Sequence, residues 1–259
     1  QYGDFVMETD AEVGRLLKAL DDQGLAENTF LVFTSDNGCS PSANYPELLA
    51  KGHNPSGKLR GHKADIYEGG HRVPFLVRWP AKVKSGQTTN QLTCLTDFTA
   101  TVADILKVKL PETAAEDSFS FLPALTGESG QSVRESIVHH SIGGYFAIRE
   151  GDWKLALCPG SGGWSNPRPG QEPDGSPKVQ LFNLRADLAE TENLEAKHPE
   201  IVARLTQKLE SLVTNGRSNA GASQANAVPI DLWKKAGPRG AKGAKKKAGP
   251  AKAASKSGN

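Results

Sequence analysis

Long hydrophobic runs are absent from this sequence of 259 residues. No window approaches the roughly 18 to 20 consecutive apolar residues that a membrane-spanning helix needs, so we expect no membrane span. Only three cysteines occur, Cys39, Cys94 and Cys158. They are too few and too scattered for a disulfide framework or for a zinc site with paired CxxC spacing. The first residues, Gln-Tyr-Gly-Asp, contain neither an initiator methionine nor a signal peptide.

Charge is distributed unevenly along the chain. Residues 232–259 contain nine basic side chains and no acidic one, whereas residues 1–231 contain 22 basic and 29 acidic side chains. Beyond Asn215 apolar residues become rare, and such a segment cannot bury enough surface to offset its ordering entropy. Residues 215–259 are therefore predicted to form a disordered basic tail. A contact of this tail with polyanions stays open, whereas no specific nucleic-acid partner is predicted.

The first part of the chain alternates between helix and strand patterns. Apolar residues near helical spacing predict an amphipathic helix over residues 4–22, ended by Gly24. Residues 29–34 form a continuous apolar run, which is typical of a strand buried on both faces of a parallel sheet. A second strand and another helix are expected over residues 73–80 and 96–106. This rhythm predicts an α/β fold for residues 1–133.

Short β runs replace this pattern from about Arg134. Runs at 136–140, 145–149, 153–157 and 179–184 predict an antiparallel sheet, closed by a helix over residues 199–213. Residues 134–214 are therefore expected to form a small antiparallel C-terminal subdomain. The stretch 159–178, rich in Gly, Pro and Ser, is predicted to be either a mobile insertion or a loop on the substrate side.

A carboxylate and an amide follow the first apolar strand directly, as Asp36 and Asn37, and Gly38 comes next. Open α/β sheets place their sites at such strand ends. The two side-chain oxygens form a hard donor pair that suits Ca²⁺ or Mg²⁺. Taken alone, Asp-Asn-Gly is also an ordinary turn sequence.

A second stretch, residues 57–74, favours a functional interpretation of this triplet over an ordinary turn. It reads GKLRGHKADIYEGGHRVP and contains the pattern G-K-x-x-x-Y-E-G-G-x-R-V-P, with His62 in place of the first glycine. The two motifs resemble the sulfatase family of the alkaline-phosphatase superfamily, in which a strand-end Asp-Asn-Gly precedes this signature. The resemblance covers most of residues 2–213. It implies the C-terminal portion of an arylsulfatase A-like α/β fold.

The resemblance also implies roles for individual residues. Asp36 and Asn37 would be two ligands of a divalent cation, usually Ca²⁺ in this family, with Mg²⁺ as the alternative. Lys63 would bind a sulfate oxygen and stabilise charge on the leaving oxygen. The pair His139 and His140 is expected either to bind substrate or to be structural.

Other residues of the signature are interpreted as structural. His62 and His71 flank the loop but are not assigned as general acids. The remaining motif residues are expected to hold the shape of the loop, with Glu and Arg as a buried pair: Tyr67, Glu68, Gly69, Gly70 and Arg72.

The nucleophile that the family requires is not recognisable in the sequence. It arises from Cys or Ser in C/S-x-P-x-R by oxidation to formylglycine. The segment that begins at Cys39 has Ala43 where the arginine belongs and lies after the Asp-Asn-Gly, so Cys39 is interpreted as a loop cysteine. Formylglycine is expected upstream of Gln1. The chain would then be a fragment or, as the alternative, a truncated product that is inactive by itself.

The activity implied by the resemblance is that of a sulfuric ester hydrolase, which cleaves aryl or carbohydrate sulfate monoesters. Family habit implies a periplasmic or secreted location. Two alternatives stay open. One is a phosphonate monoester hydrolase or phosphodiesterase of the same superfamily, and the other is an inactive fragment that binds polyanions through its basic tail.

Overall fold

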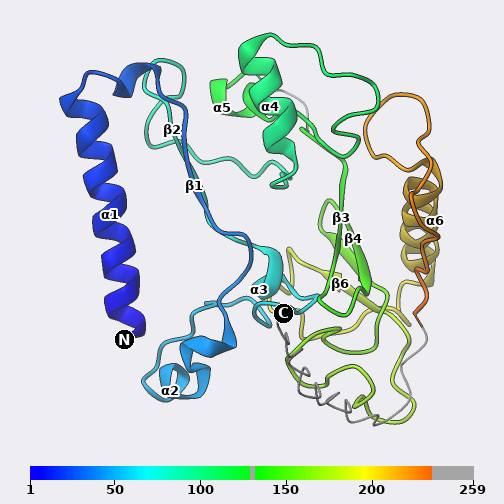
Figure 1. The fold of residues 1–259 in the computed structure, drawn as a ribbon. Coiled ribbons are helices and arrows are strands. Elements are labelled where there is room, and N and C mark those ends of the chain that lie inside the picture. The colour runs from blue at the N-terminus through cyan, green and yellow to red at the C-terminus, as the bar shows by residue number, and fades with distance from the viewer. Residues whose placement is uncertain (129–131, 235–259) are drawn as a thin grey trace, which may run out of the picture.

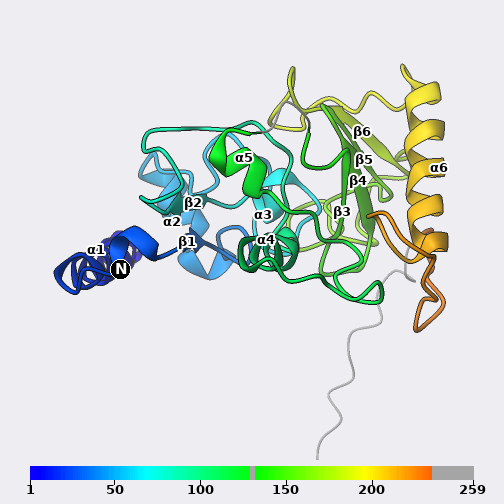
Figure 2. The ribbon, with the colours of Figure 1, turned by 90° about the horizontal axis from the view of Figure 1, so that it is seen from above.

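The computed structural model describes residues 1–128 and 132–234. Two sheets are formed, one with the strand order β1-β2 and one with the order β3-β4-β5-β6. Figures 1 and 2 show α1 at one end of the molecule, α6 at the other, and the two sheets between them. Among the described residues, no helix combines the length and the apolar character needed to cross a membrane.

The predicted N-terminal helix is confirmed as α1 (Tyr2–Asp22). The chain leaves this helix through Gly24, whose φ of +67° lies in the left-handed region that glycine adopts without a steric cost. None of the residues of α1 is buried. Phe5 and Met7 have exposed fractions of 69% and 72%. The apolar side chains of this amphipathic helix are thus left without a covering element among the described residues.

Beside α1 lies the small sheet of β1 (Leu31–Thr34) and β2 (Phe75–Arg78). The two strands are antiparallel, and the residues of β1 are only partly buried or exposed. The prediction of a parallel strand buried on both faces is therefore wrong for this structure. A continuous apolar run gives neither the direction nor the number of neighbouring strands, and here the chain returns through residues 35–74 to pair with its own next strand.

Short helices surround this sheet. The predicted helix over residues 96–106 is confirmed, and the others were not predicted because each has at most six residues, too few to show a helical period. The described helices of this part are the 3₁₀ turns Ala26–Asn28 and Pro41–Ala43, and α2 (Tyr45–Ala50), α3 (Glu68–His71), α4 (Asp97–Leu106) and α5 (Leu122–Thr126).

The predicted C-terminal sheet is confirmed in full. It consists of β3 (Ser136–His140), β4 (Phe146–Glu150), β5 (Trp153–Ala156) and β6 (Gln180–Asn183), each antiparallel to the next. The predicted closing helix is α6 (Pro199–Asn215). Figure 2 shows α6 alongside this sheet, at the end of the molecule opposite α1.

Alternate residues of this sheet face two different layers. On one face Ile148, Leu155 and Leu181 pack with Leu205 and Leu209 of α6. On the other face lies a second apolar cluster that includes residues of the stretch 57–74: Ala147, Ala156, Phe182, Ile66 and Tyr67. The period of two along each strand thus places the sheet between α6 and the motif-bearing loop.

The segment after α6 differs from its prediction as far as it is described. Arg217 is only 7% exposed and donates through Nη1 to the carbonyl oxygens of Ala222, at 2.9 Å, and Glu112, at 3.2 Å. Leu232 belongs to the cluster beneath α6. Isolated residues such as these carry no periodic signal, so the sequence did not reveal that Arg217 and Leu232 are buried, whereas most residues between them are exposed. The rest of the predicted tail, residues 235–259, lies outside the described residues.

Candidate functional site

The turn Asp36–Gly38 follows β1 and rests on the signature loop, as we name residues 57–74. The Gly38 amide donates to the Gly70 carbonyl over 3.0 Å, and the Lys63 amide donates to the Cys39 carbonyl over 3.0 Å. A Cβ atom on Gly38 would lie 1.7 Å from the Gly69 carbonyl oxygen. Only glycine permits this approach. The two motifs are therefore joined by backbone hydrogen bonds, although 24 positions separate Cys39 from Lys63 in the sequence.

The functional groups at this junction are left available. Asp36 is exposed, and Asn37 and Lys63 are partly buried. Asn37 donates through Nδ2 to the Gly38 carbonyl over 3.0 Å, which leaves its Oδ1 free to act as a ligand. Within the described ranges, no hydrogen-bond or ion-pair partner is found for the Asp36 carboxylate or for Lys63 Nζ. The junction thus offers two oxygen donors and one ammonium group.

The two oxygens fit a hard cation such as Ca²⁺ or Mg²⁺ in chemical type. They do not complete a coordination sphere, because these ions take six or more oxygen ligands. In residues 1–128 and 132–234, no three His, Cys, Asp or Glu side chains form a group that could hold a metal ion. Asp36 and Asn37 can therefore supply only part of a ligand set.

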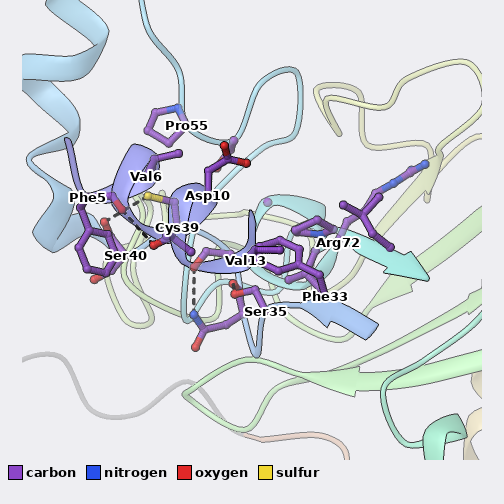
Figure 3. Close-up of a pocket in the computed structure, with 18 of the residues that line it drawn as sticks. Phe5, Val6, Asp10, Val13, Phe33, Ser35, Cys39, Ser40, Pro55 and Arg72 are labelled. Carbon is purple, nitrogen blue, oxygen red and sulfur yellow. Dashed lines mark hydrogen bonds between the residues drawn. The ribbon is translucent and has the colours of Figure 1, made fainter. Parts of the chain in front are cut away.

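A cavity of about 770 Å³ opens beside the turn, and Asn37 and Gly38 are among the residues that line it. Figure 3 shows that side chains of α1, such as Phe5 and Val13, face it together with Phe33 of β1 and Arg72. Cys39 also lines it, and its Sγ contacts the Ser40 carbonyl at 3.7 Å. A mostly apolar wall does not suit an anion, which requires hydrogen-bond donors when it is desolvated. The apolar part of this wall, formed by α1 and β1, is therefore not suited to hold a sulfate group.

Buried ion pairs anchor the signature loop to the C-terminal sheet. Lys154 of β5 is fully buried, and its Nζ lies 3.1 Å from Glu68 Oε1 and 2.8 Å from Glu190 Oε1. The second carboxylate oxygen of Glu190 accepts a hydrogen bond from the Glu68 amide over 2.7 Å. Both acids thus share one buried ammonium, which fixes the position of α3 on the sheet.

The charge on Glu68 is maintained by its neighbours. Burial alone would raise the pKa of Glu68, but Lys154 and Arg149 hold it below its ordinary value. The predicted buried pair of Glu68 with Arg72 is looser than expected. Its closest N–O distance is 3.8 Å, and the Arg72 side chain is 51% exposed. Lys154 is the buried partner of Glu68 instead.

Asp65 connects the signature loop to the stretch 159–178. Its buried carboxylate accepts hydrogen bonds from the amides of Trp164, at 2.8 Å, and Ser165, at 2.9 Å. Its other oxygen accepts from the His62 amide at 3.0 Å and also contacts Ser165 Oγ. The start of this stretch is therefore held against the signature loop, which favours the substrate-side loop over the mobile insertion.

The predicted substrate-binding histidines point in different directions. They are adjacent in β3, so their side chains emerge on opposite faces of the sheet. His139 Nε2 lies 3.2 Å from the Ile66 carbonyl oxygen of the signature loop. His140 is exposed, with its Nδ1 2.9 Å from the Ser141 carbonyl oxygen. The structure brings His139 to the signature loop, and substrate binding by either residue stays a prediction.

His139 also forms a pair with His71, and their ring centroids are 4.3 Å apart. Burial and the nearby Lys154 charge lower the pKa of His71 to about 4 and hold the pKa of His139 well below its ordinary value. Both rings are therefore neutral near pH 7. His71 Nε2 is buried and has no hydrogen-bond partner within the described part of the chain.

Three residues of this arrangement were not singled out from the sequence: Asp65, Lys154 and Glu190. Each acts on partners that are distant in sequence, such as Glu68 and Lys154, which are 86 positions apart. One signal was available, because Lys154 interrupts an otherwise apolar strand. A lysine in that position demands a buried partner, but the sequence does not say which.

Two family models match the chain. The model "Sulfatase" matches residues 1–108, and the model "N-sulphoglucosamine sulphohydrolase, C-terminal" matches residues 62–156. Among curated relatives, an N-acetylgalactosamine-6-O-sulfatase of Bacteroides thetaiotaomicron is 39% identical over 82% of this chain and 42% of the relative. Human arylsulfatase A is 31% identical over 88% of this chain and 48% of the relative. The chain thus spans less than half the length of these relatives.

Solved structures agree with this assignment. A structure from a study of glycosaminoglycan metabolism by Bacteroides thetaiotaomicron matches with a TM-score of 0.69 and 37% identity, over 81% of this chain and 44% of that one. A sulfatase of Pseudoalteromonas sp. matches with a TM-score of 0.63 and 25% identity, over 81% of this chain and 42% of that one. The chain belongs to the sulfatase family and has, over its matched region, the alkaline-phosphatase-like fold of that family.

Proposed function

We propose that this chain contributes part of the active site of an enzyme that hydrolyses sulfate monoesters. The observation that carries the proposal is the junction of the turn Asp36–Gly38 with the signature loop. There, backbone hydrogen bonds at Gly38 and Lys63 hold a carboxylate, an amide oxygen and an ammonium group on neighbouring segments. A sulfate monoester is a tetrahedral anion, and positive charge around it stabilises the transition state of its cleavage.

Each of the three side chains has a separate task in this proposal. Asp36 and Asn37 supply two oxygens to a divalent cation, Ca²⁺ or alternatively Mg²⁺. When bound, this cation provides the positive charge that polarises the sulfate oxygens. Lys63 donates a hydrogen bond to another sulfate oxygen and stabilises the charge that develops on the leaving oxygen. The nucleophile, a formylglycine, is expected outside residues 1–259.

Substrate and location are part of the same proposal. The relatives bear names that refer to carbohydrate sulfates and to aryl sulfates, and a sulfate ester of either class is the proposed substrate. The proposed location is the periplasm or the exterior of the cell. A phosphodiester or phosphonate monoester remains the alternative substrate, and no contact of the described residues favours it.

The test is the release of sulfate from 4-nitrophenyl sulfate by the full-length protein. We expect Lys63→Ala and Asp36→Ala each to lower kcat by about 100-fold or more, the scale seen when a transition-state donor is removed. Chelation of divalent cations is expected to abolish turnover, and Ca²⁺ is expected to restore it. The matched control is Lys58→Ala, in the same loop but exposed. Equal activity of the Lys63→Ala and Lys58→Ala proteins would contradict the role of Lys63.

A further inference from the structure

The stretch 159–178 contains an aromatic side chain, Trp164, that is exposed and has no ring or cation–π contact within the described ranges. We propose that Trp164 stacks against the sugar ring of a carbohydrate sulfate whose sulfate group is bound at Lys63. This inference rests on the proposed function and narrows its substrate to one class. It depends on three observations, namely the exposure of Trp164, the way its backbone is held, and its position beside the signature loop.

Trp164 is exposed where its neighbours are not. Its exposed fraction is 41%, whereas residues 160–163 are all buried. Trp79 and Trp153 pack against other rings in tilted or edge-to-face arrangements, at centroid distances of 5.4 Å from Phe30 and 5.1 Å from His198. In the described ranges no ring or cation–π contact is found for Trp164. A large apolar ring left exposed in this way is available to a ligand.

The backbone of Trp164 is nevertheless fixed. Its amide donates to Asp65 Oδ1 over 2.8 Å, and its carbonyl accepts from Arg168 Nε over 2.8 Å. The preceding Gly163 packs so closely that an added Cβ would lie 2.3 Å from the Ala64 carbonyl oxygen. The indole is thus presented from a rigid support, so little conformational entropy is lost when a ligand binds to it.

The support is the same segment that carries Lys63. Asp65, which holds the Trp164 amide, lies two positions after Lys63. The next residue, Ser165, places Oγ 3.1 Å from His62 Nε2, on the other side of Lys63 in the sequence. The backbone of Trp164 is thereby tied to both flanks of the proposed sulfate-binding lysine. A ring attached to a sulfate at Lys63 is therefore expected to lie within reach of the indole.

The surroundings of Trp164 favour a sugar over an aryl ring. A pyranose ring has an apolar C–H face, which stacks on indole, and an edge of hydroxyl groups, which need hydrogen bonds. Asn166 and Arg168 are exposed polar side chains on the same short segment as Trp164. An aryl ring lacks the hydroxyl groups that could form hydrogen bonds with these polar neighbours. The combination matches a ring with one apolar face and a polar edge.

The experiment compares two substrates in the full-length protein, N-acetylgalactosamine 6-sulfate and 4-nitrophenyl sulfate. We expect Trp164→Ala to lower kcat/KM for the sugar sulfate by about tenfold or more, mainly through KM, which is the usual loss when a central aromatic contact is truncated. The change for the aryl sulfate is expected to stay within about threefold. Trp164→Phe, which retains a ring, should recover most of the loss on the sugar sulfate.

Trp233 provides the matched control, because it is 45% exposed and lies outside the stretch 159–178. Trp233→Ala should leave both substrates unaffected, and an unchanged Tm of Trp164→Ala verifies folding. The inference is overturned if Trp164→Ala loses activity equally on both substrates, or if it loses none on the sugar sulfate. It is also overturned if the wild-type protein acts on the aryl sulfate but not on the sugar sulfate. The proposed function stands in all three cases. Failure of the wild-type protein on both substrates would instead overturn the proposed function itself, and this inference with it.

Discussion

The two ends of the molecule differ in how completely they bury their apolar side chains. At the C-terminal end, Leu205 and Leu209 of α6 are fully buried against the four-stranded sheet. At the N-terminal end, α1 has the same amphipathic pattern but buries no residue, and Leu16 is 54% exposed. A cavity of about 770 Å³ separates α1 from β1 and β2. Two helices with similar sequence patterns thus have opposite packing.

This difference indicates which part of the described structure contributes most to its stability. Buried apolar contacts are concentrated around β3–β6, α6 and the signature loop. The turn with Asp36 and Asn37 lies between this well-packed part and the open N-terminal end, and its hydrogen bonds to the signature loop connect it to the former. We therefore expect changes in the C-terminal part to lower global stability, and changes in α1 to have little effect on it.

The largest effect is expected from Lys154→Ala. This change leaves the buried carboxylates of Glu68 and Glu190 without their shared cation. Breaking a buried ion pair from one side costs about 3–5 kcal/mol of unfolding free energy, which urea denaturation can measure. The control is Lys197→Ala, whose partner Glu192 is exposed on the surface, and a loss below about 1 kcal/mol is expected there. Similar losses in the two proteins would contradict the anchoring role of Lys154.

Leu209→Ala tests how much the buried apolar side chains of α6 contribute to stability, compared with the exposed ones of α1. Removal of a fully buried leucine from the α6 interface is expected to lower the unfolding free energy by about 2–5 kcal/mol, through lost transfer energy and the cavity left behind. Leu16→Ala in α1 is the matched variant, and its loss is expected to stay within about 0.5 kcal/mol. If both variants lost equal stability by urea denaturation, the proposed contrast between the two helices would be wrong.

The His71 ring provides a pH-dependent test. Its pKa of about 4 in the folded protein lies below the ordinary value near 6.5. The fold thus favours the neutral ring, so this contribution to stability is complete above pH 6.5 and is lost as the pH falls towards 4. We expect His71→Gln to show a smaller decrease of Tm between pH 6.5 and 4 than the wild type. The pKa of His139 is lowered as well, so His139 makes the Tm of both proteins fall as the pH decreases.

His198→Gln is the control for this measurement, because His198 lies at the start of α6, away from the signature loop, and contacts Glu200 near the surface. Its Tm should fall with pH in parallel with that of the wild type. A His71→Gln protein whose Tm also falls in parallel would show that the His71 ring does not sense pH in this range.

The smallest effect on stability is expected from Phe5→Ser in α1. Phe5 is 69% exposed, so its removal should change the unfolding free energy by no more than about 0.5 kcal/mol. A cluster of exposed apolar side chains promotes association, however. Light scattering is therefore expected to show less self-association for Phe5→Ser than for the wild type at equal concentration. A clear loss of stability in this variant would mean that α1 is better packed than its exposure indicates.

Local patterns were sufficient for most secondary structure. The spacing of apolar residues predicted α1, α4, α6 and the four strands of the C-terminal sheet, because amphipathic periodicity is a property of neighbouring residues. It did not predict that β1 would pair antiparallel with β2. Pairing direction depends on where the chain goes in the 40 residues between these strands, and no local pattern records that path.

By itself, the sequence determined the order of the motifs, the elements that bear them, and the resemblance that assigns Asp36, Asn37 and Lys63 their proposed roles. Only the tertiary structure decided which distant residues meet there. It placed Lys154 between Glu68 and Glu190, and it fixed Trp164 on Asp65, which lies 99 positions earlier. The physical reason is that a buried charge or a buried amide must find a partner, whereas the identity of that partner is set by packing across the whole chain.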